Sequence, residues 1–410
     1  MGFHYSPQSF SHIVNACIFA TLPTLWLEVH SDRPSTLIYY LVYFLVYIPS
    51  CIVPPLILGT GLADYMPYQL TIMAGLTIMG LGYRLPLLNI VRPRLAQPLY
   101  WKVVAGCTLG TVGLVSLHFD IANLHVPSWG LEFYEIRSDF KETIGTASAV
   151  TAYALMWQSK VVGPLLFLHA LQTKNPLWAG VSGGVQLLIF LVTGVKTVLF
   201  SLIMLLGFYL MLSVARRGLL TGTLIALLCV VCGSALIDTC LDQETPIVTG
   251  TLVRRNMFIP GLLTAYYYDF FSENPKQYMA NAFLLRHFVD SPYQVSAAQT
   301  IGLEYFGSYE ASANANLWSD SYANLGLIGI PIYSLVLAVV LWIFDSLSTG
   351  VDRRLATVLL AMPAMAIVNT GMLTVLLSHG LVLAMLAMFL YPTDENSAAD
   401  TKGTLSDGSV

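Results

Sequence analysis

Long hydrophobic stretches, separated by short polar segments, run through almost the whole of this chain. We identify about eleven of them, each near the roughly 20 residues that a helix needs to cross a membrane. They are residues 10–29, 36–58, 67–88, 99–118, 147–170, 177–193, 195–213, 219–237, 321–343, 355–370 and 373–391. Because a bilayer offers no water to an open backbone, these stretches are predicted to be helices. The expected fold is therefore all-α, a polytopic membrane protein with about 11 transmembrane helices.

The polar intervals divide the chain into four parts. Residues 1–237 are predicted to form an N-terminal bundle of about eight helices, with an outer loop at 119–146. Residues 238–320 form the one large loop, and residues 321–391 return to the membrane. The tail, 392–410, is rich in Ser, Asp and Gly and is predicted to be disordered.

Composition supports the same class of protein. The chain is 56% hydrophobic and only 10% charged, whereas soluble domains carry about 25% charged residues. The six cysteines lie in or beside apolar stretches, so no disulfide framework is expected. Cys229 and Cys232 form a C-x-x-C without a neighbouring histidine or acid, and they are interpreted as packing residues.

The basic residues predict the orientation. Ten of them lie in five short loops: Arg33, Arg84, Arg92, Arg94, Lys102, Lys174, Arg216, Arg217, Arg353 and Arg354. Seven are spread over the longer alternate loops: Arg137, Lys141, Lys196, Arg254, Arg255, Lys276 and Arg286. By the positive-inside rule the first set is cytoplasmic. Residues 119–146 and 238–320 are then outside, with the C-terminus in the cytoplasm.

The large outer loop carries the candidate chemistry. Arg254-Arg255 suits a phosphate group, because guanidinium groups bind phosphate oxygens in a bidentate geometry, and a lipid-linked pyrophosphate is the natural ligand at membrane level. An interfacial or structural ion pair is the alternative. The aromatic run 266–271 fits an interfacial belt or a platform for sugar rings. Asp320 fits a general base or a helix cap, and His287 fits a base or an exposed loop histidine.

Three ionisable residues lie within or between the apolar stretches. Lys196 follows Thr193-Gly194 and either has a function at membrane depth or extends to the interface. Lys160 either pairs inside the bundle or lines a cavity, and His379 is either a base or a packed neutral histidine. Thr193-Gly194 and Asn369-Thr370-Gly371 each fit a tight turn or a kink within the membrane.

Five short pieces of the chain resemble a known family. They are Tyr134–Arg137, Thr193–Lys196, Arg255–Gly261, Tyr266–Phe271 and Asn314–Gly326. In order, in spacing and in the single large outer loop, the chain resembles the O-antigen polymerases of bacterial surface polysaccharide synthesis over roughly residues 120–345. The motifs are short and degenerate, and the architecture matches more fully than the motifs do.

The resemblance implies a GT-C-like membrane glycosyltransferase of the bacterial inner membrane that needs no cofactor or metal. Its substrates would be undecaprenyl-pyrophosphate-linked oligosaccharides, joined at the periplasmic face. A polysaccharide chain-length regulator is the implied protein partner, and no nucleic acid is involved. The resemblance places outer-loop arginines at Arg137 and at Arg254 or Arg255. Lys196 stands where many relatives have arginine, which weakens a bidentate contact but keeps the charge.

The expected mechanism assigns roles to nine residues. Arg254, Arg255 and Lys196 would hold the pyrophosphate, which leaves as a stabilised anion. Asp320, and after it Asp269 or His287, would activate the acceptor hydroxyl. The remaining substrate-binding candidates are Arg137, Asn316 and Tyr268.

Three other functions remain open at the level of sequence. An O-antigen ligase would use the same chemistry with a histidine of the large loop, where His287 is the only one, although nothing around it matches the ligase motif. A transporter or flippase of lipid-linked glycans would instead carry its charges within the helices. A structural membrane protein is the third.

Overall fold

The protein is all-helical in the part of the chain that the computed structural model describes. That part comprises residues 9–26, 32–59, 61–93, 95–127, 132–214, 218–241, 246–280, 287–309 and 311–392. Seven helical runs there are long and apolar enough to cross a membrane: Thr36–Leu58, Gln97–His118, Pro176–Thr193, Lys196–Ser213, Leu219–Leu241, Leu317–Leu347 and Met372–Leu390. The predicted class, an all-α membrane protein, is confirmed at this level.

The four other predicted stretches are helical too. They are covered by α1 (Phe10–Thr21) with η1 (Leu22–Leu25), α4 (Leu62–Gly82), α7 (Ala149–Trp157) with η4 (Gln158–Val162) and α8 (Gly163–Thr173), and α17 (Arg353–Leu359) with α18 (Ala361–Asn369). The end of the first stretch, most of the predicted tail, and Arg94, Arg216, Arg217 and Arg286 lie outside the described residues. The long hydrophobic stretches therefore predicted the positions of these helices well.

The chain folds into two compact units. Unit 1 takes its described residues from Met1–Leu87, Val214–Trp342 and Ala364–Val375. Unit 2 takes them from Leu88–Ser213, Ile343–Pro363 and Leu376–Val410. The predicted N-terminal bundle, 1–237, contributes helices to both units.

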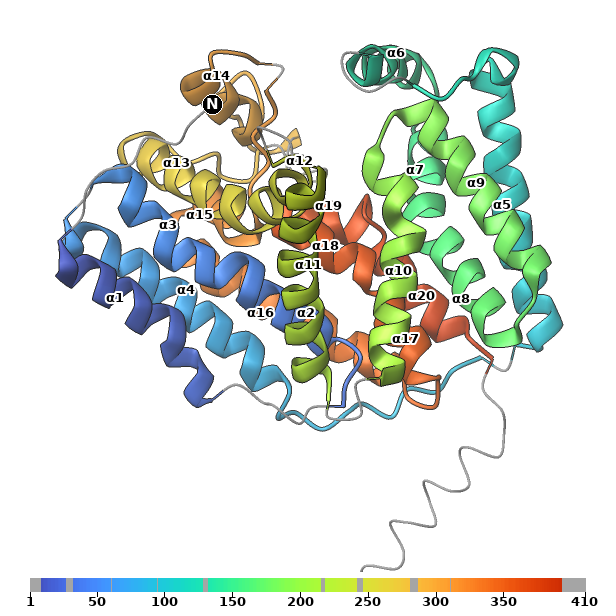
Figure 1. Cartoon of the computed structure of the whole chain (residues 1–410), viewed down its shortest axis with the longest axis horizontal. Helices are drawn as coiled ribbons and strands as arrows, with labels where there is room; N and C mark the ends of the chain where they lie inside the picture. The colour runs from blue at the N-terminus through green and yellow to red at the C-terminus, as the bar shows by residue number, and fades with distance from the viewer. Residues whose placement is uncertain are drawn as a thin grey trace, which may run out of the picture. The chain divides into compact units, whose positions relative to one another are not determined.

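Unit 1 is built around α3. Its further elements are α2 (Thr36–Val42), η2 (Tyr43–Tyr47), α3 (Ile48–Leu58), α11 (Leu219–Leu241), α12 (Ile247–Thr249), η5 (Gly250–Phe258), α13 (Ile259–Glu273), α14 (Ala297–Phe306), α15 (Leu317–Leu325), η7 (Gly326–Ile328), most of α16 (Gly329–Leu347) and α19 (Met372–Leu377). Helix α3 packs against α1 and α13, and α13 packs against α15 (Figure 1). Much of the large loop is thus helical and packed onto an apolar helix.

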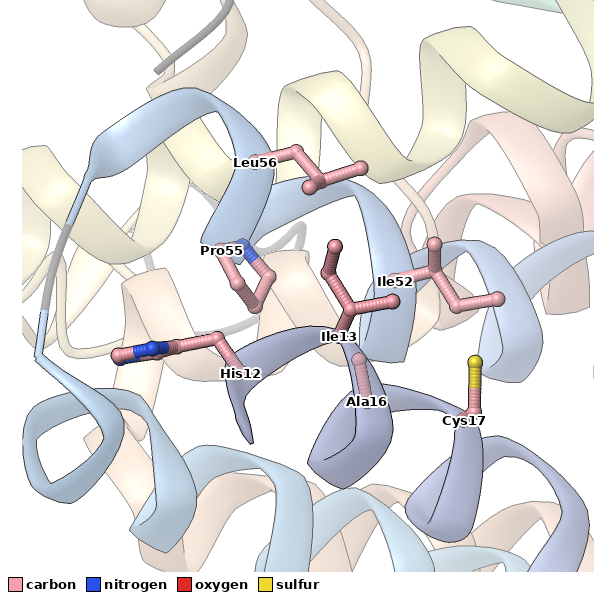
Figure 2. A pocket seen from close by; sticks show the side chains of 7 residues that line it. All are labelled: His12, Ile13, Ala16, Cys17, Ile52, Pro55 and Leu56. Atoms are coloured by element: carbon pink, nitrogen blue, oxygen red, sulfur yellow. The ribbon is translucent and has the colours of Figure 1, made fainter. Parts of the chain in front are cut away.

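A shallow hollow that is open to its surroundings lies between α1 and α3 in unit 1. Figure 2 shows its lining, which consists of His12, Ile13, Ala16, Cys17, Ile52, Pro55 and Leu56. The walls are almost entirely apolar, so the hollow suits a surface that faces lipid chains. It offers few partners to a hydroxyl-rich ligand.

Unit 2 contains residues 119–146, which were predicted to form an outer loop. Its further elements are α5 (Gln97–His118), η3 (Ile121–Asn123), α6 (Glu132–Thr146), α9 (Pro176–Thr193), α10 (Lys196–Val214) and α20 (Leu381–Leu390). Helix α6 lies across one end of α9 (Figure 1). Phe133 of α6 is buried in a cluster with Phe190 of α9 and Val198 of α10, so burial of apolar side chains holds α6 in place.

The two polar interruptions that were predicted to be a turn or a kink both lie between separate helices. Gly194 has a φ of +61°, which glycine tolerates, and it forms a tight turn between α9 and α10. Helix α18 ends at Asn369, and Thr370 and Gly371 separate it from α19. Both are breaks between helices, and neither is a bend in one continuous helix.

Candidate functional site

Three of the five resembling pieces meet in unit 1. They occupy η5, α13 and the whole of α15. Thr264 of α13 forms hydrogen bonds with Asn316 (3.0 Å) and with Ser319 (2.9 Å). These buried bonds fix α13 against α15, and they bring the candidate residues of both helices into one unit.

Asn316 positions helix α15. Its side-chain oxygen accepts hydrogen bonds from the backbone N–H groups of Trp318 (3.0 Å) and Ser319 (3.1 Å). Its amide donates to Thr264, and the side chain is fully buried. Asn316 is therefore the N-cap of α15. The alternative in which Asp320 caps this helix is wrong, because Asp320 lies within the first turn.

Asp320 points its carboxylate at Gly371, which precedes α19. A methyl group at Gly371 would lie 2.4 Å from Oδ2 of Asp320, so the carboxylate fits there only because Gly371 has no side chain. The amide of Asn324 lies 3.5 Å from the other oxygen. The side chain of Asp320 is partly buried. The Asp320 carboxylate therefore lies in a confined space.

Asp269 lies on the exposed side of α13 and is joined to a tyrosine of α14. The Tyr305 hydroxyl donates a hydrogen bond of 2.5 Å to Oδ2 of Asp269. The Tyr305 ring stacks on Tyr266, with ring centroids 4.2 Å apart and an angle of 10° between the planes. Burial, and then the bond to Asp269, raises the pKa of Tyr305 well above its usual value, so the hydroxyl stays protonated.

The aromatic run of α13 is divided between packing and the surface. Tyr267 and Phe271 are buried. Tyr268 is half-buried among Tyr65, Tyr68 and Tyr322, and its hydroxyl donates to the carbonyl of Asp64 (2.5 Å). Tyr266, beside Asp269, is the other partly exposed tyrosine of the run.

Arg254 and Arg255 are exposed on η5, a nine-residue π-helix that leads directly into α13. Such helices are rare and occur often at functional sites. Arg255 forms no ion pair with any other described residue. His287 is exposed and follows the undescribed residues 281–286.

The two remaining resembling pieces meet in unit 2. The Arg137 side chain of α6 donates from Nε to the carbonyl of Gly194 (3.2 Å). The Lys196 ammonium group lies 4.2 Å from the centre of the Phe133 ring, a cation–π contact. The structure thus brings Arg137 and Lys196 together at the turn between α9 and α10.

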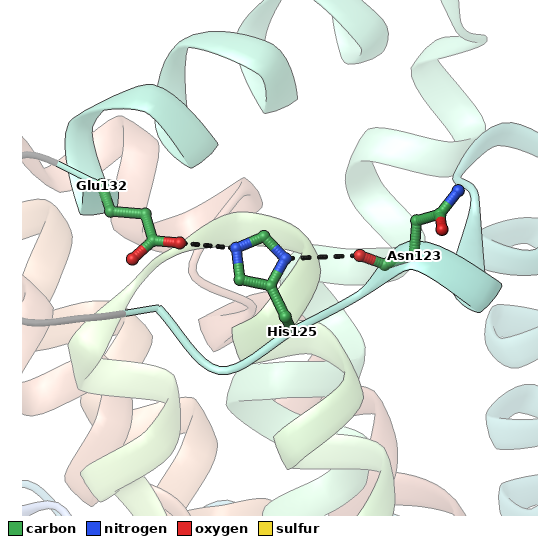
Figure 3. A network of polar contacts seen from close by, with 3 residues as sticks. All are labelled: Asn123, His125 and Glu132. Carbon is green, nitrogen blue, oxygen red and sulfur yellow. Dashed lines mark hydrogen bonds and ion pairs between the residues drawn. The ribbon is translucent and has the colours of Figure 1, made fainter.

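An ion pair that the sequence did not indicate joins η3 to α6. Nε2 of His125 lies 2.5 Å from the carboxylate of Glu132, and Nδ1 lies 3.3 Å from the carbonyl of Asn123 (Figure 3). The hydrogen bond to Glu132 is the main cause that raises the pKa of His125. The pair therefore stabilises the loop at pH values below the ordinary histidine pKa, and this contribution is lost as the pH rises through the higher folded pKa.

Lys160 and His379 are in direct contact in unit 2, the Lys160 ammonium against Nδ1 of His379. Lys160 lies in the π-helical turn η4, and His379 lies between α19 and α20. Trp157 donates a hydrogen bond to the carbonyl of Leu377 (2.8 Å) at the same place. Of the two interpretations of Lys160, the structure supports pairing within the bundle.

Comparison of the chain with protein-family models, with curated proteins and with solved structures finds no match. The functional assignment therefore depends on the residues and on where the fold places them. Unit 1 holds the candidate residues Arg254, Arg255, Asp269 and Asp320 and an aromatic surface, and unit 2 holds Arg137 and Lys196. Tyr305 and Gly371 belong to this arrangement only through the fold, because nothing in the sequence near them connects them to Asp269 or Asp320.

Proposed function

We propose that this chain is an O-antigen-type polymerase of the bacterial inner membrane. It transfers an oligosaccharide from undecaprenyl pyrophosphate to another lipid-linked repeat unit at the periplasmic face, where residues 238–320 lie. All eleven predicted stretches cross the membrane in this proposal, and the C-terminus is cytoplasmic. The observation that carries it is the pair of exposed arginines on a π-helix that is continuous with α13 and its aromatic and acidic residues.

The arginines bind the pyrophosphate. When the bond between the anomeric carbon and the phosphate oxygen breaks, negative charge develops on the leaving pyrophosphate. Guanidinium groups fixed beside it stabilise that charge in the transition state, and loss of one such donor costs about 10²–10³-fold in rate. Arg137 and Lys196 place further positive charge at the outer end of unit 2.

A carboxylate accepts the proton of the acceptor hydroxyl. The hydroxyl oxygen attacks the anomeric carbon as the pyrophosphate leaves, and the proton passes to the base. Asp320 is the first candidate, because its carboxylate lies in a confined space beside Gly371 and, within the described part of the chain, has a single long side-chain contact, to Asn324. Asp269 and His287 are the alternatives, and both are exposed.

The test is the surface polysaccharide of a strain that lacks the gene. Plasmids would supply the wild-type chain, Arg255→Ala or Arg84→Ala, where Arg84 is an exposed arginine predicted to lie on the cytoplasmic side. We expect single repeat units on the lipid anchor in the deletion strain, and a full ladder with wild type and with Arg84→Ala. Arg255→Ala should leave single units, with normal protein in the membrane fraction.

Other patterns would reject parts of the proposal. A full ladder in the deletion strain would exclude a polymerase. Loss of all polysaccharide from the lipid anchor, including single units, would indicate a ligase. A normal ladder with Arg255→Ala would remove Arg255 from the mechanism.

A further inference from the structure

Tyr266, Tyr305 and Asp269 form a compact group at the surface of unit 1. The two tyrosine rings are stacked and partly exposed, and they come from α13 and α14. Phe306 meets Tyr266 edge-on, with ring centroids 5.8 Å apart, and extends the apolar surface. Asp269 is exposed beside them. Two helices that are separated in sequence therefore bring aromatic surface and a carboxylate together.

The hydrogen bond from Tyr305 fixes the direction of the carboxylate. It occupies Oδ2 of Asp269, while Oδ1 accepts no hydrogen bond from the described part of the chain. An ionised carboxylate oxygen can accept bonds from more than one hydroxyl group. The free oxygen is thus held in a fixed position next to the tyrosine rings and open to solvent.

This combination fits one class of ligand. The negative face of an aromatic ring attracts polarised C–H groups, and a sugar ring presents such groups on one side. Its neighbouring hydroxyls lie in the ring plane, where a carboxylate accepts strong, charge-assisted hydrogen bonds. An apolar ligand would not use Asp269, and a phosphate would be repelled by it.

We propose that Tyr266, Tyr305 and Asp269 form a binding subsite for one pyranose ring with neighbouring free hydroxyls. The ring packs against the tyrosines, and Oδ1 of Asp269 accepts from its hydroxyls. The identity of that ring as a sugar of the glycan substrate rests on the proposed polymerase function. Tyr305 has two roles here, since its ring binds the sugar ring and its hydroxyl positions Asp269. Asp269 is then a ligand of the sugar, which leaves Asp320 and His287 as the candidates for the base.

The experiment measures binding without polymerisation. The probe is the soluble oligosaccharide released by mild acid from the lipid-linked intermediates of the source bacterium. Its affinity for the purified full-length protein in detergent is measured by saturation-transfer NMR. Tyr305→Ala and Asp269→Asn should each weaken binding about tenfold, because one stacking contact or one charged hydrogen bond is lost.

Two further variants show whether a loss of binding comes from the missing contact or from misfolding. Tyr305→Phe keeps the ring and releases Asp269, so we expect an intermediate affinity and an unchanged melting temperature. Tyr309→Ala removes an exposed tyrosine outside the group and should bind like wild type. Equal affinity of the probe for wild type, Tyr305→Phe and Asp269→Asn would overturn the subsite, and this holds even if Tyr305→Ala does not fold.

The readout separates this proposal from the polymerase proposal. Loss of binding in Asp269→Asn together with a full ladder in the deletion strain would keep the sugar subsite and reject the polymerase. Normal binding in Asp269→Asn with single units in Arg255→Ala would keep the polymerase and reject the subsite.

Discussion

At the scale of single residues, the site depends on partners that are distant in sequence. Asp320 has space for its carboxylate only because position 371 is a glycine. Asp269 is held by Tyr305, which lies on a different helix. Both acids were predictable candidates, since they stand in the polar part of a hydrophobic chain. Their immediate environments were not, because tertiary contacts create them.

Substitution of Gly371 by alanine should displace Asp320. The added methyl group would overlap both carboxylate oxygens, at 2.4 and 2.8 Å. We expect the free energy of unfolding to fall by about 1–3 kcal/mol, as for other overpacked sites. If Asp320 is the base, the polysaccharide ladder should be lost while the protein remains folded. Thermal unfolding in detergent and the polysaccharide gel measure the two effects.

Gly110→Ala is the matched control for that substitution. Gly110 lies in the middle of α5, and a methyl group there would meet nothing within 4 Å. Alanine favours a helix over glycine by about 0.5–1 kcal/mol, so this variant should be as stable as wild type or more stable. Identical melting of Gly371→Ala and wild type would contradict the close contact between Gly371 and Asp320.

Helix caps show what residue types alone can predict. Asp320 was expected as a possible cap of the helix that follows the large loop, but Asn316 fills that position. The sequence offered Asn316 as a sugar ligand and Asp320 as a possible cap. In the structure Asn316, and not Asp320, caps α15, and the Asn316 side chain is fully buried.

At the scale of elements, α13 is the helix that carries the unit 1 site. Its contact with α3 is very close at Gly261, where a methyl group would lie 2.7 Å from the carbonyl oxygen of Pro49 and 2.8 Å from the side chain of Val53. Small residues permit such close backbone approach between helices. The position of Asp269 and of the aromatic run therefore depends on a glycine in the first turn of α13.

Gly261→Ala should push α13 away from α3. The atoms that it meets belong to backbone and to a branched side chain, which cannot turn aside, so we expect a loss of about 1–3 kcal/mol in the free energy of unfolding. Melting temperature in detergent is the measurement. Gly250→Ala, in η5, meets nothing within 4 Å and should melt like wild type. A Gly261→Ala protein as stable as the Gly250→Ala protein would refute the tight packing of α13.

The long hydrophobic stretches predicted the apolar helices, but they did not predict the helices of the large loop. Residues 238–320 were expected to form one polar loop, and they contain α12, η5, α13 and α14. Their sequence mixes aromatic, polar and small residues without a clear apolar face. Packing against α3 and α15 stabilises α13, and no local pattern reports that packing.

At the scale of the whole molecule, each unit is assembled from three separate parts of the chain. The order of the helices could be predicted from the sequence, but their grouping could not. Helices in a membrane associate through close packing and a few polar contacts, because lipid is as apolar as their surfaces. Contacts such as Lys160 with His379 join segments that are far apart in sequence, and hydropathy carries no information about them.

The number of membrane crossings depends on the segment formed by α7, η4 and α8. It contains about 25 residues, which at 1.5 Å each is longer than the hydrocarbon core. It is not among the seven runs that are long and apolar enough to cross a membrane by length and composition, and Gln158, Ser159 and Lys160 interrupt it in the middle. Gln158 and Ser159 are buried, and Lys160 is paired with His379. Polar groups with partners inside the protein are compatible with a membrane span, so we expect this segment to cross.

Cysteine labelling tests this expectation. The six native cysteines, all free, would be replaced, and Ser138→Cys or Ser312→Cys introduced at exposed positions, the first on α6 and the second between α14 and α15. Between these positions lie residues 149–173 and the runs 176–193, 196–213 and 219–241. If 149–173 crosses, the number of crossings is even, and an impermeant maleimide should label both cysteines in intact cells. Labelling of only one would mean that 149–173 does not cross, because the two loops would then face opposite sides. In that case Arg137 would lie on the membrane face opposite to Arg255, and the proposal that both loops are periplasmic would be wrong.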